Sequence, residues 1–214
     1  MSLDVITIES TNANYPAALR PRKTQALFPR ISTIGNPEIL KRQMLGLFCS
    51  VKCLGDLILM TYDLVRALRD AGVPVISGFH TPIEKDCLDL LLRGSQPIVI
   101  CPARDIRNMR VGKDLKTGIG EGRFLILSPF EGTGRRRTAQ IAERRNQFVG
   151  ALAAAAFVAY ADTGGKTEAF AKDFMGVGKP IYTFQSQYNE PLLEIGAKPV
   201  DTKLLAQWAA SWKK

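Results

Sequence analysis

Short apolar segments, bounded by glycine, proline or polar residues, recur along the chain from Met44 onward. Their length and unbroken apolar character are typical of strands buried on both faces of a sheet. They span residues 44–49, 73–77, 97–101, 123–128, 156–160 and 179–184. Helix-like stretches separate them, and the clearest covers residues 57–71 and stops at Gly72. This alternation predicts an α/β fold: a Rossmann-like, doubly wound, mostly parallel sheet.

Residues 1–43 show little periodicity and carry four prolines, at positions 16, 21, 29 and 37. Prolines at such density interrupt regular secondary structure. We therefore expect an irregular N-terminal arm over residues 1–43, packed on a single Rossmann-like domain formed by residues 44–214.

Basic residues exceed acidic ones by 29 to 20, which gives a formal net charge of +9. Such an excess favours polyanions or anionic surfaces. The most apolar segment, residues 148–160, is alanine-rich and shorter than the roughly 20 residues that cross a bilayer. The first residues also lack the basic-then-apolar pattern of a signal peptide. We expect a cytoplasmic protein without a membrane partner.

The four cysteines form no CxxC pair, and the sequence has one histidine. A closed zinc site needs four Cys or His ligands at short paired spacings, so we expect no metal. The GxGxxG fingerprint of dinucleotide binding is missing as well, and we expect no cofactor.

Ligands of doubly wound sheets bind outside the carboxyl ends of the strands, where loops lead into helices. The first such loop is Cys49-Ser50-Val51-Lys52. Ser50 supplies a hydroxyl, Lys52 a cation, and the following helix its free N–H groups, which together suit a phosphate. The alternative is a plain strand-to-helix turn with a solvated lysine.

A second loop begins at Ser77 and Gly78, where the missing side chain permits close approach of a ligand to the backbone. Phe79 follows and could stack on a base. Thr81 and Glu84 have the spacing of a capping box, which predicts a helix start.

A third loop contains Gly164, Gly165, Lys166 and Thr167. It resembles the end of a P-loop, but Tyr160 stands where the first P-loop glycine is required, so we reject a Walker A site. A glycine-rich loop with a lysine at a helix start is still a reasonable anion site. The glycine-rich residues 118–122 precede a strand instead, and we interpret them as a turn.

Two arginine clusters, residues 135–137 and Arg144-Arg145, precede the predicted strand at 156–160. Guanidinium groups match phosphate oxygens, and the two clusters could follow one nucleic-acid backbone. The alternative is a solvated charged surface.

Taken in order, these segments resemble the DNA-processing protein A (DprA, also called Smf) family, within the superfamily that also holds the LOG-type phosphoribohydrolases. The similarity runs from about Asn14 to Phe184. It rests on Asn14-Tyr15-Pro16, Ile34-Gly35-Asn36-Pro37, Cys49-Ser50-Val51, Ser77-Gly78-Phe79, Arg144-Arg145-Asn146-Gln147, the loop 162–167 and Gly178-Lys179-Pro180.

The resemblance implies a Rossmann-like core that binds single-stranded DNA, works with a RecA-type recombinase during DNA uptake and forms a homo-oligomer. It implies that Ser50, Ser77, Gly78, Arg145 and Lys166 line the DNA pocket. The chain departs from the family where Val51 and Gln147 replace arginines and Cys49 replaces a glycine.

Our leading hypothesis is a single-stranded DNA-binding protein without catalysis. We expect its phosphate contacts to come from Ser50, Lys52, Ser77, Gly78, Phe79, Arg144, Arg145, Gly164, Gly165, Lys166 and Thr167. Two alternatives remain open: a sensor of a small nucleotide, and a LOG-type enzyme that cleaves a nucleoside monophosphate. For the enzyme, Glu84 and Glu168 are the carboxylates near the loops, but the spacing around Glu168 differs from the LOG motif.

Overall fold

The computed structural model describes residues 4–132 and 139–213. Within this part, nine strands form one sheet in the order β1-β2-β6-β5-β4-β3-β7-β8-β9. The strands are β1 (Ile6–Glu9), β2 (Arg30–Gly35), β3 (Leu45–Phe48), β4 (Val75–Ser77), β5 (Ile98–Ile100), β6 (Phe124–Ser128), β7 (Ala155–Val158), β8 (Ile181–Phe184) and β9 (Lys198–Val200). Neighbours from β6 to β9 pair in parallel, which confirms the predicted Rossmann-like, mostly parallel sheet.

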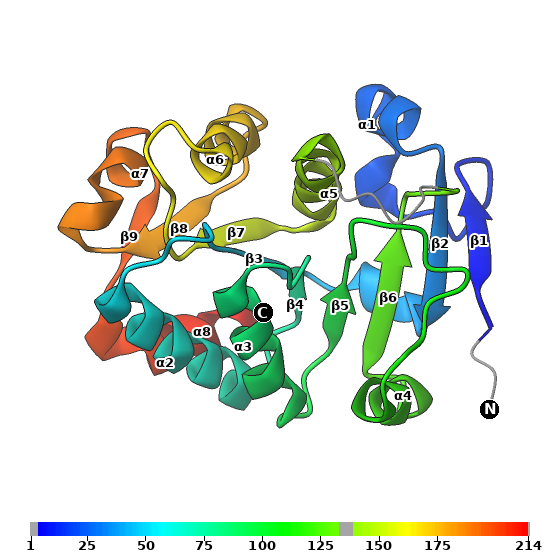
Figure 1. Cartoon of the computed structure of the whole chain (residues 1–214), viewed down its shortest axis with the longest axis horizontal. Helices are drawn as coiled ribbons and strands as arrows, with labels where there is room; N and C mark the ends of the chain where they lie inside the picture. The colour runs from blue at the N-terminus through cyan, green and yellow to red at the C-terminus, as the bar shows by residue number, and fades with distance from the viewer. Residues whose placement is uncertain (1–3, 133–138, 214) are drawn as a thin grey trace.

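Helices cover both faces of the sheet (Figure 1). The α-helices are α1 (Arg22–Leu27), α2 (Gly55–Ala71), α3 (Pro82–Leu92), α4 (Lys113–Gly120), α5 (Ala139–Leu152), α6 (Lys166–Gly176), α7 (Glu190–Glu194) and α8 (Leu205–Ala210). Short 3-10 helices are η1 (Ala17–Leu19), η2 (Pro37–Lys41), η3 (Gln187–Asn189), η4 (Thr202–Leu204) and η5 (Ser211–Lys213). In Figure 1, α2, α3 and α8 lie on one side of the central strands, and α5 and α6 on the other.

Alternating side chains of the strands fill two separate hydrophobic cores. Leu47 of β3 packs in the core that α2, α3 and α8 cover, whereas the adjacent Phe48 packs with Phe170 of α6 in the other core. The period of two follows from strand geometry, in which successive side chains point to opposite faces. Both faces are buried, which is why these strands are continuous apolar segments in the sequence.

The N-terminal segment differs from the irregular arm that its prolines predict. It contributes β1 and β2, which extend the sheet beyond β6 by antiparallel pairing. The four prolines lie outside these two strands, so they do not interrupt the ladder. Ser32 and Thr33 are buried polar residues of β2, and this strand therefore lacks the continuous apolar character of the central strands. The sheet thus continues across the predicted boundary at residue 44.

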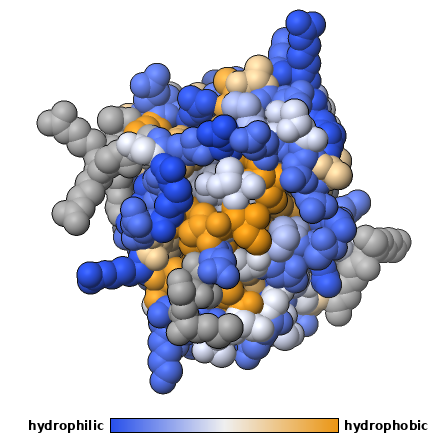
Figure 2. Space-filling view, turned by 90° about the vertical axis from the view of Figure 1, so that its right-hand side faces the viewer, coloured by the Kyte–Doolittle hydropathy of each residue, from blue (hydrophilic) through white to orange (hydrophobic). Residues whose placement is uncertain are grey.

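The outer edge of the sheet is formed by β1, which has only four residues. Figure 2 looks at this side of the molecule and shows apolar atoms gathered near its centre within a hydrophilic surround. Ile6 of β1 is 52% exposed, while Glu9 at the end of the strand forms an ion pair with Arg30. A short edge strand that ends in a charged residue resists pairing with other chains.

The chain direction across the sheet reverses at β3. From β3 the chain proceeds through β4, β5 and β6 on one side, and it then returns to place β7, β8 and β9 on the other side. Such a reversal is a topological switch point, where the loops after the two central strands diverge and leave room for a ligand. The loops after β3 and β7 are therefore the first place to look for a site.

Of the glycine-rich residues 118–122, predicted to be a turn, residues 118–120 form the end of α4 instead, and residues 121–122 form the turn that follows it. Gly118 is buried there, and a Cβ at this position would lie 2.1 Å from Cε2 of Phe124 in β6. A side chain at position 118 would therefore push α4 away from the sheet or displace the Phe124 ring.

We expect Gly118→Ala to lower the free energy of unfolding by about 1–3 kcal/mol, because the Phe124 ring must shift in a close-packed core. Gly120→Ala is the matched control, since a Cβ there meets no atom within 4 Å. The control should leave stability unchanged or raise it by up to about 1 kcal/mol. Chemical denaturation measures both variants, and equal effects would contradict the packing argument.

Candidate nucleic-acid interface

Ser50 joins the loop after β3 to the loop after β7. Its backbone N–H donates to the carbonyl of Tyr160 at 2.9 Å, and its Oγ accepts from the N–H of Asp162 at 3.1 Å. The same hydroxyl donates to Oγ1 of Thr167 at 3.1 Å. Ser50 is buried, so these bonds are protected from water. The predicted residues Ser50 and Thr167 are thus in direct contact at the switch point, beside the start of α6.

Glu84 joins the loop after β3 to the loop after β4. Its Oε1 accepts from the N–H of Cys49 at 3.2 Å, and its Oε2 accepts from the N–H groups of His80 at 2.8 Å and Thr81 at 3.3 Å. The Thr81 hydroxyl caps the Glu84 N–H in return, so the predicted capping box is confirmed. Burial raises the pKa of Glu84, while the charge of Arg145 and the three N–H donors oppose that rise.

Ser77 is a second buried hydroxyl at the carboxyl edge. Its Oγ donates to the carbonyl of Leu47 at 2.7 Å and accepts from the N–H of Phe79 at 3.2 Å. These bonds tie β4 to β3 and fix the start of the next loop. The hydroxyl of Ser77 is therefore occupied by contacts within the protein.

Arg145 of α5 packs directly over Gly78. A Cβ at Gly78 would lie 1.4 Å from a terminal guanidinium nitrogen of Arg145, so any side chain at position 78 would displace the guanidinium. The Arg145 side chain is buried, and its Nε donates to Oδ1 of Asn146 at 2.8 Å. Among the described residues, one of its terminal nitrogens is buried without a hydrogen-bond partner. Burial lowers the pKa of Arg145, and the Glu84 charge opposes this. The guanidinium thus has a buried N–H donor, near the end of β4, that has no acceptor among the described residues.

Phe79 does not offer its ring to solvent. The residue is only 6% exposed, and its side chain belongs to the core that α2 and α3 cover. Its backbone has φ of 44°, which is uncommon for a residue other than glycine and is typical of functional loops. The prediction that bases stack on Phe79 is therefore wrong for this conformation, because the ring is buried in the hydrophobic core.

The glycine-rich loop before α6 is held by the carboxylate of Glu168 and by the backbone carbonyl of Asp162. Gly164 has φ of 70°, and its N–H donates to Oε2 of Glu168 at 2.6 Å. Glu168 also forms an ion pair with Lys172, and both contacts lower the pKa of Glu168. The N–H of Gly165 donates to the carbonyl of Asp162 at 2.8 Å. Two of the N–H groups expected to bind an anion are thus already engaged.

Lys166 lies at the start of α6 and faces α5. Its Nζ is 2.7 Å from Oε1 of Glu143, and both side chains are about half exposed. The two residues border a hollow of about 230 Å³ between α5 and α6, together with Asn146 and Gln147. Lys166 therefore lies near the predicted site, with its charge partly neutralised by Glu143.

Lys52 and Val51 lie at the exposed tip of the first loop, and Val51 is 65% exposed. Within the described residues, Lys52 carries no ion pair, so its ammonium group is open to a ligand. Behind the tip, the Cys53 thiol is hydrogen-bonded to the thiol of buried Cys49, which lowers the pKa of Cys53.

Arg144 points away from the three loops. It donates to the carbonyl of Leu27 at 2.5 Å, and its guanidinium lies 5.8 Å from the ring centroid of Phe28. Adjacent positions on a helix face different directions, which separates Arg144 from the buried Arg145. The cluster at residues 135–137 lies outside the described residues.

Most of the predicted residues therefore gather at one edge of the sheet. Ser50, Ser77, Gly78, Arg145 and Thr167 lie around the carboxyl ends of β3, β4 and β7, with Lys52 and Lys166 at the rim. Sequence reasoning missed Glu143 as the partner of Lys166 and Asp162 as the partner of Ser50. The pair Glu168 and Lys172 has the i, i+4 spacing that a helical pattern reveals, whereas the other two contacts are long-range.

The doubly wound sheet and the position of its switch point define a Rossmann-like α/β protein. The family model for DNA recombination-mediator protein A matches residues 5–212, and the chain belongs to this family. No curated protein sequence matches the chain.

Solved structures agree on the fold. DNA processing protein A (DprA) from Streptococcus pneumoniae superposes with a TM-score of 0.75 at 15% identity, over 95% of this chain and 73% of that one. DNA processing protein A from Helicobacter pylori superposes with a TM-score of 0.75 at 17% identity, over 98% of this chain and 97% of that one. The molybdenum cofactor carrier protein from Chlamydomonas reinhardtii superposes with a TM-score of 0.53 at 9% identity, over 80% of this chain and 98% of that one.

Two further observations concern the described residues. Among them, no helix is both long and apolar enough to cross a membrane. The described His, Cys, Asp and Glu side chains also form no group of three that could hold a metal ion.

We expect Glu84→Gln to lower the free energy of unfolding by about 1–3 kcal/mol, because it weakens buried hydrogen bonds to backbone N–H groups and removes the negative charge that acts on buried Arg145. It also replaces one acceptor oxygen by a donor group beside backbone N–H groups. Urea denaturation measures the loss. Glu121→Gln is the control: its ion pair with Arg123 is partly exposed, and its loss should cost less than about 1 kcal/mol. Similar costs for both variants would contradict the role of Glu84.

Proposed function

We propose that this protein binds single-stranded DNA through backbone phosphates at the loops that follow β3, β4 and β7, and acts as a recombination mediator. The observation that carries the proposal is the pair of buried contacts from Ser50 and Glu84. They fix three loops together at the switch point, beside the N-termini of α2, α3 and α6. Helix N-termini that converge in this way suit an anionic ligand.

Charge and family support the same ligand. The net charge of +9 favours a polyanion through counterion release. Lys52 and Lys166 lie at the rim of the site, and Arg145 keeps a buried donor without a partner among the described residues. The chain belongs to the DNA recombination-mediator protein A family, and the Helicobacter pylori relative is described with a single-stranded DNA binding mode.

The cellular context is part of this proposal and comes from the family resemblance. A RecA-type recombinase would be the protein partner, the active form would be a homo-oligomer, and the location would be the cytoplasm. Uptake of single-stranded DNA during transformation would be the process that such a protein serves.

A sensor of a small nucleotide is the second candidate. The pairing of Lys166 with Glu143 and the engaged N–H group of Gly164 favour it, because both reduce the donors left for a long polyanion. The molybdenum cofactor carrier proteins with the same fold are named for a small ligand. The LOG-type reaction has less support, since both oxygens of Glu84 and both oxygens of Glu168 already hold contacts within the protein.

Oligonucleotide binding over a range of salt concentrations tests the leading proposal. The log of the affinity should fall linearly with the log of the salt concentration, with a slope near −0.7 for each phosphate contact. Lys52→Ala should make that slope shallower by about 0.7, as expected for the loss of one contact. Lys116→Ala is the charge-matched control, because α4 lies beyond the opposite end of β6 (Figure 1).

Fluorescence anisotropy with a labelled oligonucleotide gives these affinities. Tight binding of a mononucleotide, with no oligonucleotide binding even at low salt, would reject the DNA proposal and favour the nucleotide sensor.

Glu143→Gln should tighten oligonucleotide binding by about 2–10-fold. It removes a carboxylate that would repel phosphate and frees the ammonium group of Lys166. Glu121→Gln has the same change of charge near the opposite end of the sheet and should have a smaller effect. The same anisotropy assay compares them. An effect of Glu143→Gln no larger than that of Glu121→Gln would show that Lys166 is not part of the interface.

A further inference from the structure

Two cysteine thiols meet behind the tip of the first loop. Cys49 directly follows β3, Cys53 lies two residues before α2, and their thiols are hydrogen-bonded to each other. Both cysteines are free in the structure. Three residues separate them, and residues 49–54 belong to no helix or strand. The two sulfur atoms can therefore approach to the roughly 2.0 Å of a disulfide bond by movement of the loop alone.

The two thiols differ in access and in acidity. Cys53 is partly exposed, whereas Cys49 is only 3% exposed. The hydrogen bond from the Cys49 thiol lowers the pKa of Cys53 and raises the pKa of Cys49. The N-terminus of α2 lies close to Cys53 in the chain and also favours a negatively charged sulfur. Cys53 is therefore the thiol that an oxidant in solution meets first, with Cys49 behind it.

We infer that Cys49 and Cys53 form a redox modification site, at which hydrogen peroxide joins the two sulfur atoms in a disulfide bond. The Cys53 thiolate attacks one peroxide oxygen, the O–O bond breaks, and the leaving hydroxide takes up a proton to become water. Cys53 is then a sulfenic acid. The Cys49 sulfur loses its proton and attacks the Cys53 sulfur, the S–O bond breaks, and a second water leaves. Two thiols are thus oxidised, and one peroxide is reduced to two molecules of water.

Contacts on one side of the pair determine which part of the loop moves on oxidation. The N–H of Cys49 donates to Oε1 of Glu84 at 3.2 Å. Ser50 is buried and bonded to the loop after β7. Lys52 lies at the exposed tip between the anchored Ser50 and Cys53. Closure of the disulfide therefore moves the tip, and with it the ammonium group of Lys52.

The consequence of oxidation for DNA rests on the proposed function. In the reduced protein, Lys52 is exposed at the rim of the site and carries no ion pair with a described residue. Movement of the tip takes this ammonium group away from its phosphate, so oxidation weakens DNA binding. A dithiol reductant reverses the change by thiol–disulfide exchange.

Peptide mapping after peroxide treatment tests the modification directly. Trypsin cleaves after Arg42, Lys52 and Arg66, so the two cysteines lie on separate peptides, 43–52 and 53–66. We expect these peptides to appear as one linked species, lighter than their sum by two hydrogen atoms and separated by dithiothreitol. The number of free thiols in the denatured protein should fall from four to two.

Two variants identify the pair. Cys53→Ser should abolish the linked peptides, because the accessible thiol is gone. Cys87→Ala is the matched control and should leave them unchanged, since Cys87 is a fully buried residue of α3. A link between Cys53 and Cys87 would overturn the inference. Conversion of Cys53 to a sulfinic acid, with no link to Cys49, would overturn it as well.

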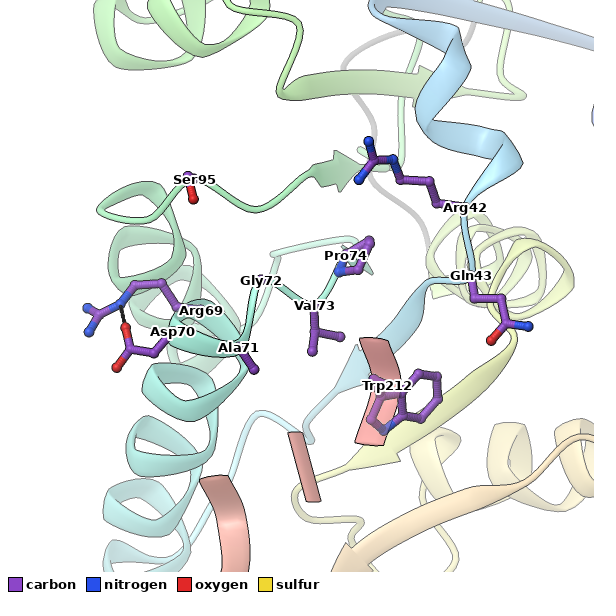
Figure 3. Close-up of a pocket in the computed structure, with 10 residues that line it drawn as sticks. All are labelled: Arg42, Gln43, Arg69, Asp70, Ala71, Gly72, Val73, Pro74, Ser95 and Trp212. Atoms are coloured by element: carbon purple, nitrogen blue, oxygen red, sulfur yellow. Dashed lines mark hydrogen bonds and ion pairs between the residues drawn. The ribbon is translucent and has the colours of Figure 1, made fainter. Parts of the chain in front are cut away.

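The opposite end of the strands supplies a control for general damage by peroxide. Trp212 borders a hollow of about 610 Å³ there, beside Val73 and Pro74, and none of the ten residues drawn in Figure 3 is a cysteine. We expect the tryptophan emission spectrum to be the same in the reduced and oxidised protein. A spectrum typical of unfolded protein after oxidation would contradict a change confined to the loop.

Fluorescence anisotropy of the reduced and oxidised protein tests the effect on DNA. Oxidation should make the salt dependence of oligonucleotide binding shallower by about 0.7, as expected for the loss of one phosphate contact. Dithiothreitol should restore it, and Cys53→Ser should bind like the reduced protein with or without peroxide. A disulfide that forms without changing DNA affinity would overturn the regulatory role. If the reduced protein does not bind DNA, the DNA proposal fails, whereas the peptide map still decides whether the modification site exists.

Discussion

The buried carboxylate of Glu84 holds the loops after β3 and β4 in one arrangement. Removing a carboxylate from water is costly, and it is tolerated here because three backbone N–H groups and the charge of Arg145 surround it. Arg145 is buried as well, and its guanidinium occupies the space that a side chain at Gly78 would need. Glu84, Gly78 and Arg145 therefore depend on one another. Ser50 extends this arrangement to the loop after β7, which brings three helix N-termini to the switch point.

The charges at the rim determine what this rigid centre can bind. Lys52 is exposed at the tip of its loop, whereas Lys166 is held by Glu143 and the glycine-rich loop is held by Glu168. Val51 and Gln147 stand where the family resemblance implies arginines. A phosphate backbone must therefore compete with carboxylates for part of its contacts. Because of this competition, both single-stranded DNA and a small nucleotide are candidate ligands of the site, and experiments must distinguish them.

The sequence predicts the central sheet well because β3 to β8 are buried on both faces and are continuous apolar segments. It does not predict β1 and β2, because their exposed and polar residues do not form a continuous apolar segment. In the structure, β2 pairs with β6 and β1 pairs with β2. The capping box at Thr81 and Glu84 is local and was predictable, but the contact of Glu84 with Cys49, 35 positions away, was not. Arg144 and Arg145 look alike in the sequence. Only their directions on α5 distinguish Arg144, which contacts Leu27 of the N-terminal region, from Arg145, which packs against Gly78. The predicted roles of these residues in binding remain predictions.

Hydrogen exchange followed by mass spectrometry, with and without a single-stranded oligonucleotide, tests the central claim most directly. The account predicts that DNA slows exchange in residues 49–54, 77–81 and 162–167 together, because Ser50 and Glu84 join these loops into one surface. Unchanged exchange in all three loops at a saturating concentration of oligonucleotide would contradict it.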